Sequence, residues 1–211
     1  MNKQNNVILA VESAICGGSI SLLKDGIEIA NWIGSSNVSK AEDLLVNIDA
    51  ILTSTKVSRH DIDLVAVSAG PGSFTGIRIG LATALGLKAG LGIEMASESA
   101  LKAMVRDKSE SNPVTAALPV GRNSVCLQTF QILDREVDSI NEPYTLSDDV
   151  FFDFLRGKNN EEFVLHDSLY ERCDATPLVT NFGTNLAFAI GSICSEYPGI
   201  IAAPLFVSKS V

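Results

Sequence analysis

Residues 69–80 read Ala-Gly-Pro-Gly-Ser-Phe-Thr-Gly-Ile-Arg-Ile-Gly, and no other stretch of the chain says more about its fold. The stretch follows an apolar run at residues 64–67 that is typical of a buried strand, and it leads into a long segment of small residues that is typical of a helix. We expect Gly70, Pro71 and Gly72 to form the structural turn between the two. The glycine spacing differs from G-x-G-x-x-G, and no lysine follows as in a Walker A loop, so neither common nucleotide-binding motif is present.

The first half of the chain predicts a series of strands and helices around this turn. Short apolar runs, an Asp25-Gly26 hairpin signal and helical spacing of apolar residues indicate the elements. Ser39 and Glu42 fit a capping box at the start of the first helix. We expect three antiparallel strands, an amphipathic helix, a strand, a helix, a strand and a helix, in that order, at residues 7–11, 19–23, 27–33, 39–56, 64–68, 75–91, 93–97 and 100–108.

A polar break at residues 107–113 is the predicted domain boundary. Residues 1–110 are expected to form an N-terminal βββαβα lobe, and residues 111–211 a divergent C-terminal α/β lobe. In the second lobe we expect strands at 114–118, 125–133 and 163–165 and helices at 146–155 and 186–196. This order is a loose echo of the first half and indicates a duplicated α/β unit.

Composition and charge exclude several classes of protein. Hydrophobic residues make up 46% of the 211 residues, which is enough for a folded core. The net charge is −9, and residues 111–211 carry 13 acidic against 6 basic residues, so the chain lacks the basic surface of a stand-alone nucleic-acid binder. No apolar run reaches the roughly 18 residues of a membrane span, and we expect a cytoplasmic protein with four free thiols.

The residue types needed for catalysis are sparse. His60 and His166 lack the spacing of metal ligands, which predicts no catalytic metal. Ser73 has neither flanking glycines nor a nearby histidine, so a nucleophile is not indicated. Glu12 and the Gly17-Gly18 pair could hold Mg²⁺ and phosphate, or they could simply end a strand and form a hairpin; we favour the hairpin. The sequence therefore predicts no catalytic, cofactor-binding or metal-binding residues.

The helix expected at residues 75–91 invites two interpretations. Gly76, Gly80 and Ala84 recur every four residues, which indicates close approach to another backbone. That backbone could belong to the chain's own sheet or to a partner's helix. Arg78 is a charge in an apolar helix and needs a polar partner, for which Glu12 is the candidate.

Three stretches together resemble the TsaB (YeaZ) family of the actin-like superfamily. They are Ile8–Ser13, Glu42–Leu45 and residues 69–87 with Gly92-Ile93, and the resemblance covers about residues 7–105. The chain departs from the family's pattern at Glu12, where an Asp is usual, and at Lys40, which stands near a usual His. The resemblance implies an α/β, actin-like (ribonuclease H-like) fold of two lobes, each with a mixed sheet flanked by helices.

The resemblance also implies a function. Members of this family are non-catalytic subunits in the synthesis of threonylcarbamoyladenosine on tRNA. They pair with a TsaD-like paralogue, work with a TsaE-like ATPase, and form homodimers when alone. No cofactor is implied, and RNA would be held by another subunit. The alternative is an enzyme, either an actin-fold phosphotransferase or a glycoprotease-type metallopeptidase. The interface implied for the partner consists of Leu44, Leu45, Ile48, Gly76, Arg78, Gly80, Thr83, Ala84 and Leu87.

Overall fold

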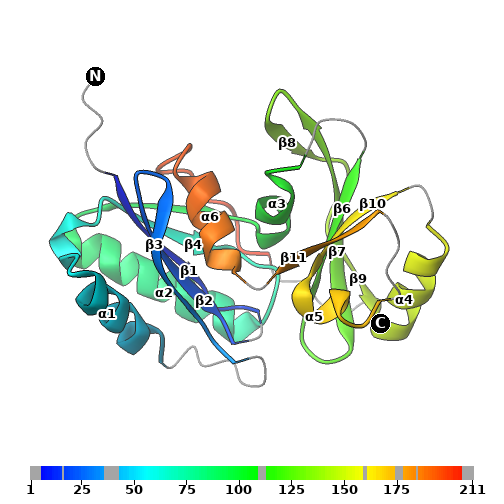
Figure 1. Cartoon of the computed structure of the whole chain (residues 1–211), viewed down its shortest axis with the longest axis horizontal. Coiled ribbons are helices and arrows are strands. Elements are labelled where there is room, and N and C mark those ends of the chain that lie inside the picture. The colour runs from blue at the N-terminus through cyan, green and yellow to red at the C-terminus, as the bar shows by residue number, and fades with distance from the viewer. Residues whose placement is uncertain are drawn as a thin grey trace. The chain divides into compact units, whose positions relative to one another are not determined.

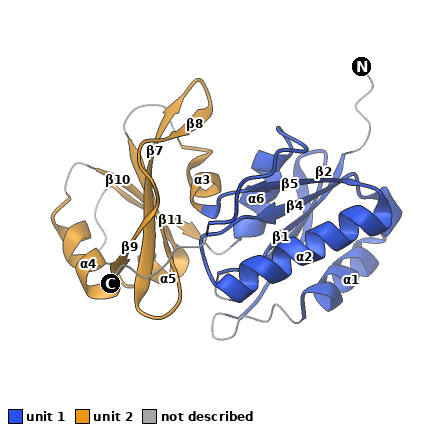
Figure 2. Cartoon of the chain, turned by 180° about the vertical axis from the view of Figure 1, so that it is seen from behind, with its two compact units in different colours: residues 1–100, 185–205 blue, residues 101–184, 206–211 orange. Residues whose placement is uncertain are grey.

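The chain folds into two compact units in the computed structural model (Figure 2). Unit 1 contains residues 1–100 and 185–205, and unit 2 contains residues 101–184 and 206–211. The structure describes residues 6–15, 17–35, 43–108, 113–158, 161–173, 178–183 and 185–205.

Unit 1 is a five-stranded mixed sheet with helices on both faces (Figure 1). The strand order is β3-β2-β1-β4-β5, in which β1 runs antiparallel to β2 and parallel to β4. The strands are β1 (Val7–Glu12), β2 (Ser19–Lys24), β3 (Ile27–Ile33), β4 (Leu64–Ser68) and β5 (Glu94–Glu98). The helices are α1 (Leu44–Thr55), the 3-10 turn η2 (Arg59–Asp61), α2 (Phe74–Leu91) and α6 (Leu186–Cys194).

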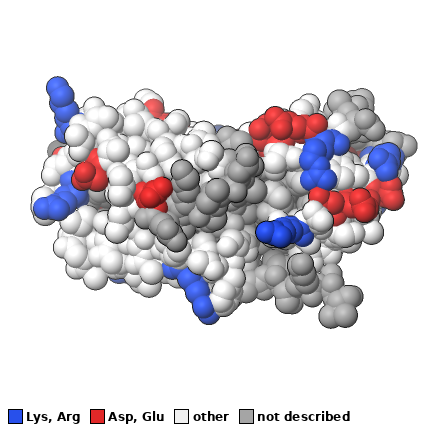
Figure 3. All heavy atoms as spheres, turned by 90° about the horizontal axis from the view of Figure 1, so that it is seen from below, with Lys and Arg blue, Asp and Glu red and all other residues white. Residues whose placement is uncertain are grey.

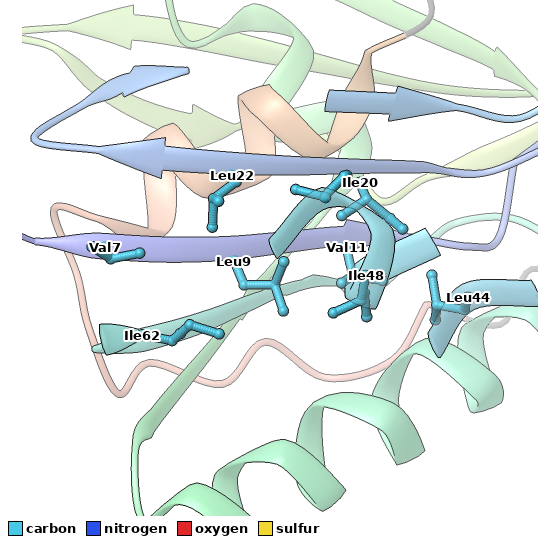
Figure 4. Close-up of a cluster of buried hydrophobic side chains, with 9 residues drawn as sticks. Val7, Leu9, Val11, Ile20, Leu22, Leu44, Ile48 and Ile62 are labelled. Carbon is cyan, nitrogen blue, oxygen red and sulfur yellow. The ribbon is translucent and has the colours of Figure 1, made fainter. Parts of the chain in front are cut away.

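The two faces of this sheet have different helix layers. Along β1, alternate residues Leu9 and Val11 join a buried cluster with Leu44 and Ile48 of α1, as Figure 4 shows. The helix α2 packs beside α1 on this face, over Val65 and Val67 of β4. The intervening residue of β1, Ala10, faces α6 on the other side of the sheet. Both faces of β1 are therefore buried, which explains its continuous apolar sequence.

Unit 2 is a second mixed sheet, with strand order β11-β10-β6-β7-β8 and with β9 paired to β7. Its strands are β6 (Val114–Pro119), β7 (Ser124–Leu133), β8 (Glu136–Ser139), β9 (Tyr144–Ser147), β10 (Glu162–His166) and β11 (Val179–Gly183). Its helices are α3 (Ala100–Val105), α4 (Asp148–Arg156) and α5 (Asp167–Tyr170). Phe151 and Leu155 of α4 pack with Phe163 and Leu165 of β10 in one buried cluster.

The structure divides the chain differently from the predicted boundary after residue 110. The units change at residues 100 and 101, and residues 185–205 return to unit 1. The return is driven by α6, which is buried against β1 and β2: a Cβ on Gly191 would lie 2.9 Å from the Cβ of Ala10. This close contact places a helix predicted for the second lobe in the core of the first.

One further local prediction differs from the structure. The helix expected at 146–155 begins later, because residues 144–147 form β9 and pair with β7 before α4 starts at Asp148. The capping box expected at Ser39 and Glu42 lies outside the described residues, and α1 is described from Leu44. Within the described part of the chain, no helix is long and apolar enough to cross a membrane.

Candidate functional site

The turn between β4 and α2 is held by hydrogen bonds within its own unit. The N–H of Gly70 donates to Ser68 Oγ at 3.2 Å, and the N–H of Ser73 donates to the carbonyl of Ala14 at 2.7 Å. Ser73 is the N-cap of α2, where its Oγ accepts from the N–H of Gly76. The N–H groups of Gly70, Ser73 and Gly76 are therefore used by the fold and are not offered to a ligand.

Gly76 and Gly80 make room for the loop that follows β1. A Cβ on Gly76 would lie 2.1 Å from the carbonyl oxygen of Ser13, and one on Gly80 would lie 2.5 Å from Ser13 Oγ. The Ser13 hydroxyl also donates to the Gly76 carbonyl at 2.9 Å. Gly76 and Gly80 therefore allow α2 to approach another part of the same chain. Of the two interpretations of their spacing, this is the contact within the chain rather than with a partner's helix.

Glu12 and Arg78 do not meet, so their predicted pairing is wrong. The Glu12 carboxylate is buried and accepts hydrogen bonds from the N–H groups of Ala14, at 2.5 Å, and Ile15, at 3.0 Å. Burial raises the pKa of Glu12 from 4.5 to about 7, and those two hydrogen bonds partly oppose the shift. Arg78 is exposed instead, and its guanidinium lies 3.6 Å from the ring centroid of Phe74.

The residues predicted for a partner interface divide by exposure. The buried members, which pack inside unit 1, are Leu44, Ile48, Gly76, Gly80 and Ala84. Thr83 and Leu87 are half-buried, whereas Leu45 and Arg78 are exposed. A residue that is buried inside its own chain offers no surface to a partner, so only the exposed and half-buried members remain candidates for contact.

The structure adds an exposed stripe along α2, of which the sequence reasoning had named only Arg78. Phe74, Arg78, Ala82, Leu85 and Ala89 recur at intervals of four and three residues, so they form one stripe along α2. All five are exposed. They recur with the helical period, but on a different face of α2 from Gly76, Gly80 and Ala84. This second periodic set is the sequence signal that could have identified them.

The neighbouring helix α1 carries two further exposed apolar residues, Leu45 and Val46. Figures 1 and 2 both show α1 alongside α2, and the two helices share a core cluster. The exposed fractions of its large apolar side chains are 61% for Leu45, 68% for Val46, 49% for Phe74 and 56% for Leu85. We call the α2 stripe together with Leu45 and Val46 the outer helix face. Seen from below, unit 1 has scattered Lys, Arg, Asp and Glu side chains among mostly uncharged atoms (Figure 3).

The two histidines are in separate units and have different surroundings. His60 is an exposed residue of η2. His166 ends β10 in a buried position, where its Nδ1 lies 3.0 Å from Ser168 Oγ. Burial lowers the pKa of His166 from 6.5 to about 4, and the charge of Asp167 partly opposes the shift. No group of three His, Cys, Asp or Glu side chains is arranged to hold a metal ion among the residues that the structure describes.

The described cysteines are free thiols. Cys126 and Cys194 are buried, Cys173 is half-buried, and Cys16 lies outside the described residues. Burial raises the pKa of both Cys126 and Cys194 to about 12, so neither has the character of a reactive thiolate.

Residues 37–188 match the family described as "TsaD: tRNA N6-adenosine threonylcarbamoyltransferase". The chain belongs to this family. Its curated relatives include the tRNA threonylcarbamoyladenosine biosynthesis protein TsaB of Escherichia coli (strain K12), with 34% identity over 111 residues. The alignment covers 53% of this chain and 48% of that protein. TsaB of Haemophilus influenzae is 30% identical over 125 residues, which are 58% of this chain and 52% of the relative. The chain thus spans about half the length of the curated relatives it matches.

Solved structures of similar fold include two YeaZ-type proteins from Pseudomonas aeruginosa. A protein with similarity to peptidase YEAZ has a TM-score of 0.68 at 16% identity, with 96% of this chain and 100% of that chain covered. YeaZ itself has a TM-score of 0.64 at 17% identity, with coverages of 90% and 92%. At these identities the comparison concerns the fold alone. It confirms the predicted α/β class, with two mixed sheets flanked by helices. The predicted resemblance to TsaB is confirmed by the sequence identity to the two TsaB proteins.

Proposed function

We propose that this TsaD-family chain is a non-catalytic subunit in the synthesis of threonylcarbamoyladenosine on tRNA, and that it docks a TsaD-like paralogue through the outer helix face. The outer helix face is the observation that carries the proposal. Large apolar side chains that are about half exposed or more on two adjacent helices typically mark a protein interface. The names of its TsaB relatives give the pathway.

The geometry around Glu12 supports a role without catalysis. In an actin-fold phosphotransferase, an acid after the first strand and the glycine-rich turns would hold Mg²⁺ and phosphate. Here the Glu12 carboxylate is buried and hydrogen-bonded to its own backbone. A carboxyl group with a pKa raised to about 7 is also a poor ligand for a hard cation at neutral pH, because the proton competes with the metal.

The partners follow from the same surface and from the charge of the chain. A paralogue of the same family would present equivalent helices, which would allow a pseudo-symmetric helix bundle; without it, a second copy would use the same face. A net charge of −9 disfavours direct contact with RNA. The catalytic subunit would therefore hold the tRNA, a TsaE-like ATPase would join the assembly, and its place of work would be the cytoplasm.

The docking proposal is tested by co-purification and calorimetry with the TsaD-like paralogue. Leu85→Arg places a charge in the middle of the stripe and should weaken the complex at least about tenfold, as expected for a central apolar contact. Val150→Arg is the matched control, because Val150 is 52% exposed on α4 of unit 2. Equal affinities of the two variants for the paralogue would contradict the outer helix face.

The non-catalytic role is tested separately. Calorimetry of the isolated chain with ATP and Mg²⁺ should give no tight binding, since the candidate ligands are used by the fold. Micromolar binding that Glu12→Gln abolishes would favour the phosphotransferase instead.

A further inference from the structure

A polar cavity lies in unit 1 at the opposite end of β1 from Glu12. Its volume is about 650 Å³, which is within the usual range for small-molecule sites. It lies where β1 begins, β2 ends and α1 ends, and its polar lining comprises Lys24, Thr55, Lys56, His60, Asp61 and Asp63. None of these residues belongs to the outer helix face.

The two carboxylates of the cavity are bound to backbone groups. Asp63 Oδ2 accepts from the N–H of Val7 at 2.8 Å, and Asp61 Oδ2 accepts from the N–H of Ser58 at 3.0 Å. The second bond belongs to a capping box that fixes η2. These acids therefore have structural roles that account for their presence in the lining.

The two lysine ammonium groups are not held by hydrogen bonds of this kind. Counting only residues that the structure describes, neither the Lys24 nor the Lys56 ammonium forms an ion pair or a hydrogen bond. Lys56 follows the last residue of α1, where its charge complements the helix dipole. That effect does not apply to Lys24, which ends a strand. Two cations thus line one cavity of an acidic protein, and one oxygen of each neighbouring carboxylate accepts a backbone hydrogen bond.

We propose that this cavity binds the phosphate or diphosphate group of a small phosphorylated molecule, held by Lys24 and Lys56 with His60 as a further donor. Lysine is a common point-charge partner for phosphate oxygens. The net charge of −9 disfavours an extended nucleic-acid strand, so a small phosphorylated ligand is favoured. The proposal is independent of docking through α1 and α2.

The test is a titration of the 211-residue chain with inorganic pyrophosphate at constant ionic strength, in which binding is followed by amide shifts in ¹H–¹⁵N spectra. We expect saturable shifts centred on residues 24, 56 and 60. Lys24→Gln should weaken binding about fivefold, the size of one ion pair at an accessible site. Lys56→Asn should do the same, since Asn tolerates the left-handed backbone (φ 59°) at this position. Lys88→Gln, on α2, is the matched control and should leave the affinity unchanged.

Further ligands distinguish the sources of the phosphate group. Ribose 5-phosphate binding more tightly than orthophosphate would indicate a phosphorylated metabolite, and equal binding would indicate a site for free phosphate; both support the proposal. Shifts that rise linearly without saturation, or that persist in both pocket variants, would overturn it. A short single-stranded oligonucleotide that binds these residues more tightly than pyrophosphate would also overturn it, in favour of a nucleic-acid contact.

Discussion

At the scale of single residues, the glycines of α2 have two different roles. Gly76 and Gly80 face the loop after β1, where an added Cβ would meet Ser13 at 2.1 Å and 2.5 Å. Gly86 and Gly90 are exposed, and an added Cβ would meet nothing within 4 Å. Some of the regularly spaced glycines of α2 are therefore required for packing, whereas others occupy positions where a larger side chain would fit.

This difference predicts opposite effects of the same substitution on stability. Gly76→Ala should lower the free energy of unfolding by about 2 kcal/mol or more, because the clash is with backbone that has to shift. Gly86→Ala should raise it by up to about 1 kcal/mol through helix propensity. Urea denaturation followed by circular dichroism measures both. Similar values for the two variants would show that the contact with Ser13 is unimportant.

The buried carboxyl of Glu12 predicts a dependence of stability on pH. Its pKa is near 4.5 when unfolded and about 7 when folded, so between these values the folded state binds a proton that the unfolded state has released. The contribution of Glu12 is therefore present below pH 4.5 and is lost as the pH rises through 7, by about 3 kcal/mol at most.

Glu12→Gln keeps an oxygen that can accept from the same N–H groups but removes the titration. It should raise the free energy of unfolding by about 1–3 kcal/mol at pH 8 and change it little at pH 4.5. Glu94→Gln, an exposed site, controls for the loss of one negative charge. Equal effects of Glu12→Gln at both pH values would contradict the raised pKa.

At the scale of elements, periodicity predicted most of unit 1. Its five strands and the helices α1 and α2 follow from apolar runs, a hairpin signal and helical spacing. It failed at residues 144–147, where a four-residue strand runs directly into α4. Strands this short are stabilised by pairing to β7, a contact made across the sequence that no local pattern reveals.

The candidate site shows the same limit. The sequence pointed to α1 and α2 but selected the face of α2 that its small residues define, and that face packs on the loop after β1 and on β4. Exposure of Phe74 and Leu85 depends on where α1 and β4 lie, which is tertiary information. The fold was thus largely accessible from the sequence, whereas the available surface was not.

The cap of α6 provides a prediction at this scale. Asn185 Oδ1 accepts from the N–H of Phe188, and its Nδ2 donates to Glu28 Oε1 at 2.8 Å. Asn185→Ala should lower the free energy of unfolding of unit 1 by about 1–2 kcal/mol. Asn31→Ala is the control, since the exposed Asn31 donates to the other oxygen of Glu28 without capping a helix, and it should cost less than about 0.5 kcal/mol. A larger loss in the control would show that Glu28, rather than the cap, is what matters.

At the scale of the whole molecule, unit 1 is built from both ends of the chain. The segment that follows α6 lies beside β5. The N–H of Ser97 in β5 donates to the carbonyl of Ile200, and the carbonyl of Ser97 accepts from the N–H of Ala202. The apolar sequence of α6 predicts that the helix is buried. It does not say which sheet buries it, because Ala10 and Leu23 lie more than 160 residues away along the chain.

A pair of fragments distinguishes the two ways of dividing the chain. Residues 1–110 alone should leave the α6 face of β1 and β2 uncovered and should aggregate or unfold without cooperativity. Residues 1–100 joined to 185–205 by a Gly/Ser linker restore α6 to that face of the sheet. This fragment should unfold in a single cooperative transition, measured by circular dichroism, and should give dispersed amide signals in ¹H–¹⁵N spectra. The two fragments separate the alternatives because the second lacks all of α3 beyond Ala100 yet contains the complete sheet of unit 1. Cooperative unfolding of residues 1–110 would instead favour the boundary drawn from the polar break, and would mean that α6 stabilises unit 1 without being required for it.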